Sequence, residues 1–204
     1  MSDFVPLREE DVDPDPLRQF AVWFEAAAEA GARAPEAAAL ATASPDGAPS
    51  ARMVLVKEWN ERGFAFYTSY ESRKGHELAA NPRAALLFHW APLGRQVRIE
   101  GTVERTTPEQ TAAHVRLRAR ASQLSALASP QSQVIESREV LERRVAKLAA
   151  EYEGEAPPLP ETWGGFRLKP ASYEFWQNRE DRLHDRLLYT PDRDGGWTLR
   201  RLAP

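Results

Sequence analysis

The chain has 204 residues, of which 42% are hydrophobic and 28% are charged, and its formal net charge at pH 7 is −3. This length suffices for one sizeable core or two small ones, and the acidic balance excludes a protein coated in basic residues for binding nucleic acid. The sequence has no cysteine, which excludes disulfides, thiolate metal sites and cysteine nucleophiles. It also shows no signal peptide and no apolar run near the ~20 residues of a membrane helix, so we expect a cytoplasmic protein that binds no membrane.

Residues 1–14 are acidic, contain proline and lack periodicity, so we predict a flexible N-terminal arm there and a single domain over residues 15–204. Asp15 followed by Pro16 is typical of a helix N-cap with proline at the first helical position. Apolar residues then recur with helical spacing, which predicts an amphipathic helix that Gly31 can end.

Residues 38–103 alternate between short apolar runs and turn signals. The runs 38–43, 53–56 and 63–68 are strand-like, and the turns between them contain glycine, which accepts a positive φ. Strands joined by such short turns predict an antiparallel meander. A helix with Ser72 as its N-cap follows, and then a strand pair at 84–90 and 96–103. The last of these strands alternates apolar and polar residues, which indicates a sheet with one solvent-facing or ligand-facing side.

The second half begins with helical patterns. Residues 108 to about 129 are helical in composition, and a second helical stripe runs from Leu141 to Tyr152. After a proline-containing linker, strand-like runs follow at 163–176, 182–189 and 197–202. The order of helix, strands, helices and strands predicts one α+β domain whose antiparallel sheet curls into a β-barrel with flanking helices.

The run 174–189 is rich in arginine and aromatic residues. In an extended segment Arg182, His184 and Arg186 point to the same side. Guanidinium groups bind phosphate and carboxylate in a planar, bidentate manner. The run therefore predicts a face directed at a flat, anionic ligand. Arg179 has no assignable role and is expected to be a solvated turn residue.

Other polar groups each allow two interpretations. Ser72, Arg73 and Lys74 open a helix directly after a strand, so its free N–H groups either bind a phosphate or are a solvated helix start. Arg52 and Lys57 lie on opposite faces of a regular strand. They share a ligand only if the strand twists or bulges, and are otherwise charges at the strand ends.

The arginines at 116, 118 and 120 do not share one helical face, so either the helix ends near Leu117 or one arginine is solvated. Ser122, Gln131 and Ser132 follow in small, polar sequence that is also typical of caps and loops. The histidines show no metal-ligand spacing, so no metal site is predicted. The sequence also lacks a phosphate-binding glycine loop, a dinucleotide fingerprint and a nucleophile elbow.

Taken together, these segments resemble the pyridoxine/pyridoxamine 5′-phosphate oxidase family, which are FMN enzymes of the split-barrel fold. The resemblance extends from about residue 13 to the end of the chain. The matching segments, in the order of the family, are 52–57, 66–68, 72–74, 95–97, 131–132, 163–167, 174–177, 182–186 and 201–204.

The resemblance implies an antiparallel FMN-binding split barrel and a homodimer with FMN at its interface. The positions that match flavin contacts are Arg52, Met53, Val54, Leu55, Val56, Lys57, Tyr67, Thr68, Arg73, Lys74, Gln96, Gln131, Ser132, Trp176 and Arg186. The positions that match substrate contacts are Lys57, His114, Arg118, Ser122, Arg182, Leu183 and His184. Arg182 and His184 match residues beside the substrate ring and are the predicted catalytic pair.

The implied reaction converts pyridoxamine 5′-phosphate or pyridoxine 5′-phosphate to pyridoxal 5′-phosphate. A hydride passes from the substrate's C4′ carbon to the flavin, and dioxygen reoxidises the flavin to give hydrogen peroxide, with ammonia released from the amine. Two alternatives remain open: a related split-barrel flavin oxidase for another ring substrate, such as a phenazine precursor, and a non-catalytic binder of flavin or pyridoxal phosphate.

The chain departs from the family pattern on the substrate side. His114 stands where the family usually has a tyrosine that touches the substrate phosphate, and the charge of a histidine varies near neutral pH. Residues 118–127 lack a proline after the first arginine and a tryptophan near the end of the segment. The N-terminal arginine–tyrosine segment of the family, thought to cover the substrate, is missing. The flavin positions show no such departures.

Overall fold

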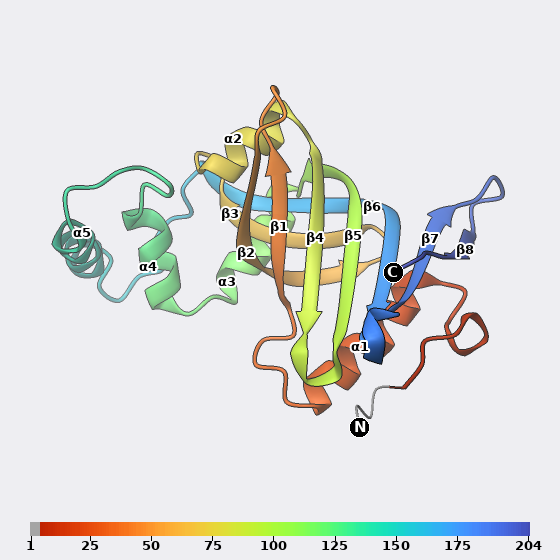
Figure 1. Ribbon diagram of the computed structural model, residues 1–204. Coiled ribbons are helices and arrows are strands. Elements are labelled where there is room, and N and C mark those ends of the chain that lie inside the picture. The colour runs from red at the N-terminus through yellow and green to blue at the C-terminus, as the bar shows by residue number, and fades with distance from the viewer. Residues whose placement is uncertain (1–4) are drawn as a thin grey trace.

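Antiparallel strands form the framework of the computed structural model, which describes residues 5–204. The strands in that range are β1 (Ala37–Ala43), β2 (Pro49–Asn60), β3 (Gly63–Ser69), β4 (Arg83–Trp90), β5 (Arg95–Arg105), β6 (Trp163–Gln177), β7 (Asp185–Pro191) and β8 (Trp197–Arg201). They pair in the order β3-β2-β1-β4-β5-β6-β7-β8, and β3 also pairs with β6. That extra pairing closes a barrel and leaves β7 and β8 as an extension beside it (Figure 1).

Helices lie around this barrel. They are α1 (Pro16–Glu29), α2 (Arg73–Ala80), α3 (Pro108–Arg116), α4 (Arg120–Ala128) and α5 (Arg138–Glu151), with short 3-10 turns η1 (Glu9–Asp11), η2 (Ala91–Leu93) and η3 (Glu180–Arg182). The helices α4 and α5 form a lobe that projects to one side, whereas α1 lies at one end of the barrel (Figure 1). In the described residues, no helix combines the length and apolar character needed to cross a membrane.

Local signals determine where α1 begins and ends. The Asp15 side chain accepts a hydrogen bond from the Leu17 N–H at 2.8 Å, and Pro16 is the first helical residue. After the helix Gly31 adopts a φ of +79°, and the Ala32 N–H reaches back to the Ala27 carbonyl at 2.9 Å. The predicted start and stop of this helix are confirmed.

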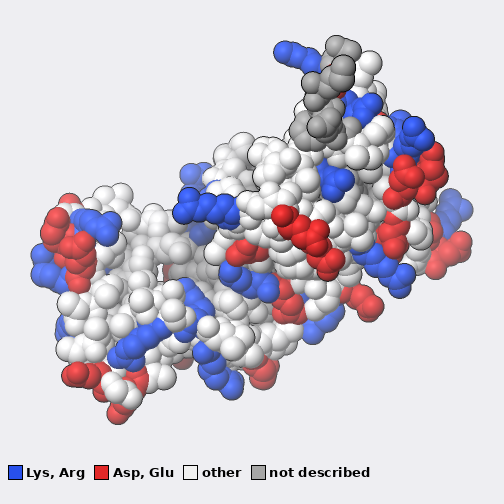
Figure 2. Space-filling view, turned by 90° about the horizontal axis from the view of Figure 1, so that it is seen from below, with Lys and Arg blue, Asp and Glu red and all other residues white. Residues whose placement is uncertain are grey.

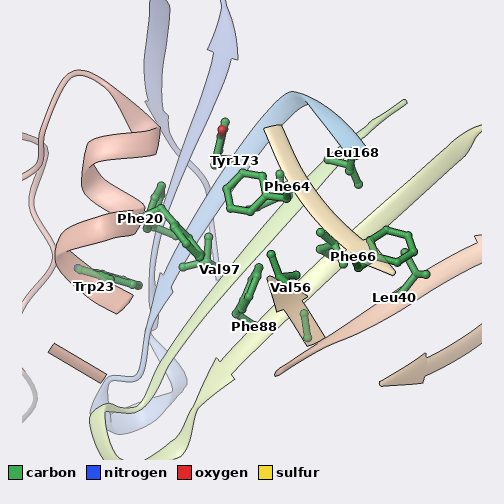
Figure 3. Close-up of a cluster of buried hydrophobic side chains, with 14 of the residues drawn as sticks. Phe20, Trp23, Leu40, Val56, Phe64, Phe66, Phe88, Val97, Leu168 and Tyr173 are labelled. Carbon is green, nitrogen blue, oxygen red and sulfur yellow. The ribbon is translucent and has the colours of Figure 1, made fainter. Parts of the chain in front are cut away.

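Aromatic rings fill the end of the barrel that α1 covers. Phe20 of α1 is fully buried, with its ring 5.0 Å from that of Phe64 and 4.9 Å from that of Phe88 (Figure 3). Further buried core residues include Leu40, Val56, Phe66, Leu86, Val97, Ile99, Leu168 and Phe175. Because neighbouring residues of a strand face opposite ways, the residues between these core positions are directed outward.

The closure of the barrel depends on the long strand β6. Its first half pairs with β3 and its second half with β7, while β5 pairs along most of its length. The register between β5 and β6 shifts at Gly101, where an added Cβ would lie 1.9 Å from the Lys169 carbonyl oxygen. Only glycine fits this close approach of two backbones.

The predicted α+β barrel with flanking helices is confirmed, with differences at element boundaries. Strand β2 begins at Pro49, earlier than the predicted 53, because it pairs with β1 along the full length of β1. The helix predicted over 108–129 is instead α3 and α4, separated by residues 117–119. The helix therefore does end near Leu117, which decides the alternative left open by the arginine spacing.

Residues 5–14 belong to the segment predicted to be a flexible arm. In the structure they contact β7 and β8: Leu7 is buried and its N–H donates to Asp185 at 3.1 Å, while Arg201 pairs with Glu9 at 2.7 Å. The division of the chain into an arm and a domain at residue 15 stays a prediction, and residues 1–4 lie outside the described part.

Candidate active site

A pocket of about 420 Å³, here called the first pocket, opens between β2, β3 and the helices α2–α4. Its lining residues are Met53, Val54, Leu55, Lys57, Tyr67, Thr68, Lys74, His114, Arg118, Ser122, Gln131 and Trp163. All of these except Trp163 are predicted site residues from separate parts of the sequence. The fold therefore brings the predicted flavin-phosphate and substrate-phosphate positions into one space.

Lys74 in the first turn of α2 is the most buried cation of the first pocket. Its Nζ donates to Gln131 Oε1 at 2.7 Å and to Thr68 Oγ1 at 3.1 Å, and the Thr68 hydroxyl also donates to Gln131. Burial and the neighbouring Arg52 lower the pKa of Lys74 to about 8. Within residues 5–204 no carboxylate pairs with this ammonium, which suits a buried anion in contact with it.

A carboxylate organises the other cations near the start of α2. Glu77 Oε2 accepts hydrogen bonds from Thr42 at 2.5 Å, Ser50 at 2.6 Å and Arg52 at 3.1 Å. Its Oε1 accepts from Arg73 Nε at 2.8 Å. Burial alone raises the pKa of Glu77, but these hydrogen bonds outweigh it and lower the pKa to about 2. Glu77 is therefore a fixed negative charge that orients two arginines.

The start of α2 is shaped for close approach. Ser72 is the N-cap and its Oγ accepts the Gly75 N–H at 3.2 Å. A Cβ on Gly75 would lie 2.1 Å from the Tyr70 carbonyl oxygen, so glycine lets the helix begin directly against the chain that precedes it. The first-turn N–H groups and the positive end of the helix dipole favour an anion at this position.

A stack of flat side chains forms one wall of the first pocket. The His114 ring lies 3.8 Å from the Tyr67 ring with an angle of 5° between their planes. The Trp163 ring lies beside this pair and nearly parallel to it, 6.0 Å from Tyr67 and 6.3 Å from His114, and the Arg118 guanidinium lies 4.5 Å over the Trp163 ring. Burial, Arg118 and Lys57 together lower the pKa of His114 to about 4.

A second pocket of about 320 Å³ lies on β4–β7 and is lined by Leu87, Gln96, Arg98, Glu174, Trp176, Arg186 and Pro204. Arg186 Nε donates to Glu174 Oε1 at 2.8 Å, and Arg186 Nη1 donates to the Ala203 carbonyl at 2.8 Å. Burial raises the pKa of Glu174, but Arg186 and Arg98 lower it by more, so the pKa lies below its usual value. The predicted flavin contacts Gln96, Trp176 and Arg186 therefore lie together, but not in the first pocket.

The predicted catalytic residues lie in the turn between β6 and β7. Arg182 is exposed and adopts a φ of +60°, a left-handed conformation that is uncommon for a residue with a side chain. His184 Nδ1 accepts the Arg179 backbone N–H at 3.1 Å, and its ring lies 4.6 Å from that of Trp176. Leu183 between them is 69% exposed.

Arg179 corrects one expectation, because it is not simply a solvated turn residue. Its backbone orients His184, and its Nε lies 3.6 Å from Asp185 Oδ2.

The remaining predicted positions lie outside both pockets. The Val56 side chain is 1% exposed and points into the barrel core, so only its backbone is available to a ligand. Arg52 and Arg73 do not line the first pocket, but both are ion-paired with Glu77. Ser132 is exposed and has a φ of +71°. Assignment of these residues to flavin stays a prediction.

The two pockets border one outward face of the sheet. Met53 of the first pocket pairs across the sheet with Ala39, which pairs in turn with Leu87 of the second pocket. This face exposes two large apolar side chains, Met53 at 64% and Leu55 at 46%. Over the side of the molecule seen in Figure 2, by contrast, acidic and basic residues are interspersed. An apolar patch of this kind marks an interaction surface.

Two family models match the chain. The model described as "Pyridoxamine 5′-phosphate oxidase" matches residues 24–152, and the model described as "Pyridoxine 5′-phosphate oxidase C-terminal dimerisation region" matches residues 163–204. Two similar relatives are both named pyridoxine/pyridoxamine 5′-phosphate oxidase. The protein from Rubrobacter xylanophilus is 57% identical over 97% of this chain and 91% of its own length. The protein from Paraburkholderia phymatum is 56% identical over 95% of this chain and 91% of its own length.

Solved structures agree on the fold. PhzG from Burkholderia lata 383, in complex with tetrahydrophenazine-1-carboxylic acid, superposes with a TM-score of 0.92 at 34% identity, over 99% of this chain and 98% of that chain. A pyridoxamine 5′-phosphate oxidase-related, FMN-binding protein from Nostoc punctiforme superposes with a TM-score of 0.73 at 17% identity, over 98% of this chain and all of that chain.

Proposed function

The chain belongs to the pyridoxine/pyridoxamine 5′-phosphate oxidase family, and we propose that it oxidises pyridoxine 5′-phosphate and pyridoxamine 5′-phosphate to pyridoxal 5′-phosphate with FMN and dioxygen. Hydrogen peroxide is released, together with ammonia when the amine is the substrate. The observation that carries this proposal is the 57% identity to a relative of that name over 97% of the chain. Likeness of fold alone would not support it, because one fold hosts many functions.

The residues around α2 fit the phosphate of FMN. Among the described residues the Lys74 ammonium hydrogen-bonds only to neutral oxygens, and Glu77 acts on it without an ion pair, so a phosphate dianion would supply a direct counter-charge. The N–H groups at the start of α2 add donors, and Arg73 lies beside them in the same helical turn. These features support FMN as the cofactor independently of the relatives' names.

Another part of the lining of the first pocket fits the phosphate of the substrate. Lys57, Arg118 and Ser122 line it together with His114, and they offer two cations and two neutral donors. The Trp163 ring supports Arg118 from one side, which restrains the guanidinium before a ligand arrives. Two phosphate sites within one pocket account for so many cations in an acidic protein.

The proposal includes a homodimer with FMN at its interface. A two-fold axis through the apolar face would set the first pocket of one protomer against the second pocket of its partner, because such an interface pairs the same patch from both copies. Gln96, Trp176 and Arg186 of one copy would then complete the site of the other. The description of the model that matches residues 163–204 supports this arrangement.

When bound, FMN would supply the hydride acceptor and the route of the electrons to dioxygen. The chain's own contribution is orientation and charge. Because His184 Nδ1 accepts a backbone N–H, the proton of the neutral ring resides on Nε2, which is therefore a donor toward the substrate. Arg182 acts as a clamp on the polar substituents of the pyridine ring, held ready by the left-handed turn conformation.

A single preparation tests the cofactor and the reaction. The purified protein is expected to be yellow, with the absorption of bound flavin, and to form pyridoxal 5′-phosphate and hydrogen peroxide from pyridoxine 5′-phosphate in air. Flavin-loaded protein without turnover, and without anaerobic bleaching of the flavin by substrate, would overturn the proposal in favour of a non-catalytic binder.

The role of Arg182 has its own test. Arg182→Ala is expected to lower kcat/KM by roughly 100-fold, the effect of losing one charge-assisted contact in the transition state, while the flavin content stays that of the wild type. Arg193→Ala, at an exposed arginine in the turn between β7 and β8, is the matched control and is expected to leave both quantities unchanged. Wild-type turnover in Arg182→Ala would contradict the role of the clamp.

A second candidate function rests on the ligand of the Burkholderia lata protein, a reduced phenazine carboxylic acid. In this chain His114 and the segment 118–127 differ from the family pattern on the substrate side. Turnover of a reduced phenazine carboxylic acid with a kcat/KM above that for pyridoxine 5′-phosphate would favour this function. We expect the reverse order, because Lys57 and Arg118 provide for a dianion rather than for one carboxylate.

A further inference from the structure

His114 has an unusual position for a histidine at a phosphate pocket. It lies in the last turn of α3, where its ring is held flat against Tyr67 at 3.8 Å, with Trp163 beside both rings. Within residues 5–204 neither ring nitrogen of His114 makes a hydrogen bond to the protein, whereas His184 is oriented by a backbone N–H. The stacking fixes the plane of the imidazole and leaves both nitrogens to a ligand in the first pocket.

The groups that face His114 are mainly cations. Lys57 from β2, which is ion-paired with Glu36 at 3.4 Å, and Arg118 from the segment after α3 are the charges that act on His114. Lys74 from α2 lines the same pocket, and Tyr67 on β3 supplies a neutral phenol whose pKa is raised by burial. Burial, Arg118 and Lys57 lower the pKa of His114 to about 4. The protein's own groups therefore keep the imidazole neutral at physiological pH.

A phosphate monoester in the first pocket reverses this balance. It brings up to two negative charges among Lys57, Arg118 and His114, and an opposite charge within about 4–6 Å favours the charged form of a group by 1–3 pKa units. We propose that His114 takes up a proton when a phosphate ester binds in the first pocket, so that the imidazole becomes a third cation only in the complex. This inference rests on the proposed function, since it requires the substrate phosphate to bind beside His114.

The other facing groups do not share this behaviour. Arg118 stays a cation throughout the range from pH 5 to pH 7, because the pKa of a guanidinium lies far above it even when burial lowers it. Lys74, with a pKa lowered to about 8, is also protonated there. On this proposal His114 gains charge in that range only when the phosphate is bound, and a tyrosine at the same position would not. The substitution of histidine for tyrosine thus makes phosphate recognition dependent on pH.

The size of the effect follows from the two protonation states. A pKa of about 4 that rises by 1–3 units on binding gives an uptake of roughly 0.2 to 0.9 proton at pH 5.5. For a rise of about two units, the affinity for the ligand increases roughly fourfold between pH 7 and pH 5.5 relative to a variant without an ionisable group.

The experiment uses FMN-saturated holoenzyme and 4-deoxypyridoxine 5′-phosphate, which has no oxygen or nitrogen at C4′ and is therefore not oxidised. Calorimetric titrations in buffers of different ionisation enthalpy count the protons taken up at pH 5.5, 6 and 7. His114→Tyr keeps a ring that can stack on Tyr67 but cannot take up the proton. The ligand phosphate titrates in both proteins, so the difference between wild type and His114→Tyr isolates the imidazole.

Proton uptake at pH 5.5 is expected to be higher in the wild type than in His114→Tyr, and His76→Tyr, at a 65%-exposed histidine of α2, is expected to match the wild type. Equal uptake in wild type and His114→Tyr at every pH would overturn the inference while the proposed function stands. A wild type that turns over pyridoxine 5′-phosphate but whose His114 does not titrate with ligand would do the same.

Failure of the wild type to bind the analogue or to turn over substrate would overturn both the inference and the proposed function. If His114→Tyr does not fold, the proton resonance of His114 in the wild type gives the same answer. It is assigned with His114→Gln and followed against pH with and without the analogue. A titration midpoint that rises on binding supports the inference, and an unchanged midpoint overturns it.

Discussion

Glu77→Gln is expected to destabilise the protein by about 2–3 kcal/mol at pH 7, less than the ~3–5 kcal/mol typical of breaking a fully buried ion pair. The Glu77 side chain is 8% exposed and is shared by two hydroxyls and two guanidinium groups. Glutamine keeps one acceptor oxygen and turns an NH₂ donor against these donors. The side chains of Arg52 and Arg73 are 20% and 62% exposed, so water relieves part of the loss.

The same substitution predicts a pH dependence with a definite sign. The pKa of Glu77 is about 2 in the folded protein and lies near 4.5 without the surrounding structure. A carboxylate whose pKa is lowered by folding stabilises the fold fully above about pH 4.5, and this stabilisation is lost as the pH falls toward 2. The difference between wild type and Glu77→Gln is therefore expected to shrink between pH 5 and pH 3.

Urea unfolding of the apoprotein at fixed concentration, at pH 7, 5, 4 and 3.5, measures this difference, and the melting temperature at pH 7 is expected to fall by about 5–10 °C. Glu142→Gln is the matched control, because Arg138 Nε lies 2.7 Å from Glu142 Oε1 at the same helical spacing but with Glu142 58% exposed. Its effect is expected to stay below about 0.5 kcal/mol. A deficit for Glu77→Gln that is as small as that of the control, or that does not depend on pH, would refute the reasoning.

Two further substitutions test the phosphate site and the closure of the barrel. Arg73→Ala is expected to weaken FMN binding roughly 10-fold or more, but riboflavin binding little, because a charge-assisted contact to phosphate is lost; quenching of flavin fluorescence measures both, and Arg138→Ala is the control. Equal losses for the two flavins would contradict a phosphate contact. Gly63→Ala is expected to cost more than about 2 kcal/mol, because Gly63 has a φ of +111° and an added Cβ would lie 2.0 Å from the Leu168 carbonyl oxygen. Gly47 has a φ of +87° but nothing within 4 Å of an added Cβ, so Gly47→Ala is expected to lower the free energy of unfolding by less than Gly63→Ala does. Chemical denaturation of both variants measures the two losses.

Much of the fold was predictable because each strand carries its own alternation. Val97 and Ile99 face the core while Gln96 and Arg98 line the second pocket, as the sequence pattern predicts. The closing pair β3–β6 was not predictable from such patterns, because its partners lie far apart in the sequence and neither strand encodes the other's register. The break between α3 and α4 was visible only as an inconsistency in the spacing of the arginines.

The candidate site was predictable in its cations and less so in what holds them. Glu77 was not singled out, although a glutamate four residues after Arg73 on a helix is a recognisable pairing signal. Trp163 was likewise assigned no contact, because a tryptophan before two glycines is typical of a buried core residue. Gly165 has no room for a side chain beside Tyr67, which is what brings β6 against the first pocket. Such arrangements depend on contacts between distant strands and cannot be read from one segment.

The contacts of the three cations around α2 separate their roles. Both terminal nitrogens of Arg52 are engaged, Nη1 by the Leu40 carbonyl and Nη2 by Glu77, and its side chain is 20% exposed. Arg73 engages Glu77 through Nε, and in the described residues its two terminal nitrogens make no hydrogen bond. Lys74 is buried without a carboxylate partner among those residues. We therefore expect a phosphate to gain most from Lys74 and the open fork of Arg73, whereas Arg52 is held by its own hydrogen bonds to Leu40 and Glu77. A phosphate contact made by all three cations alike would require Arg52 to give up bonds that hold β1, β2 and α2 together.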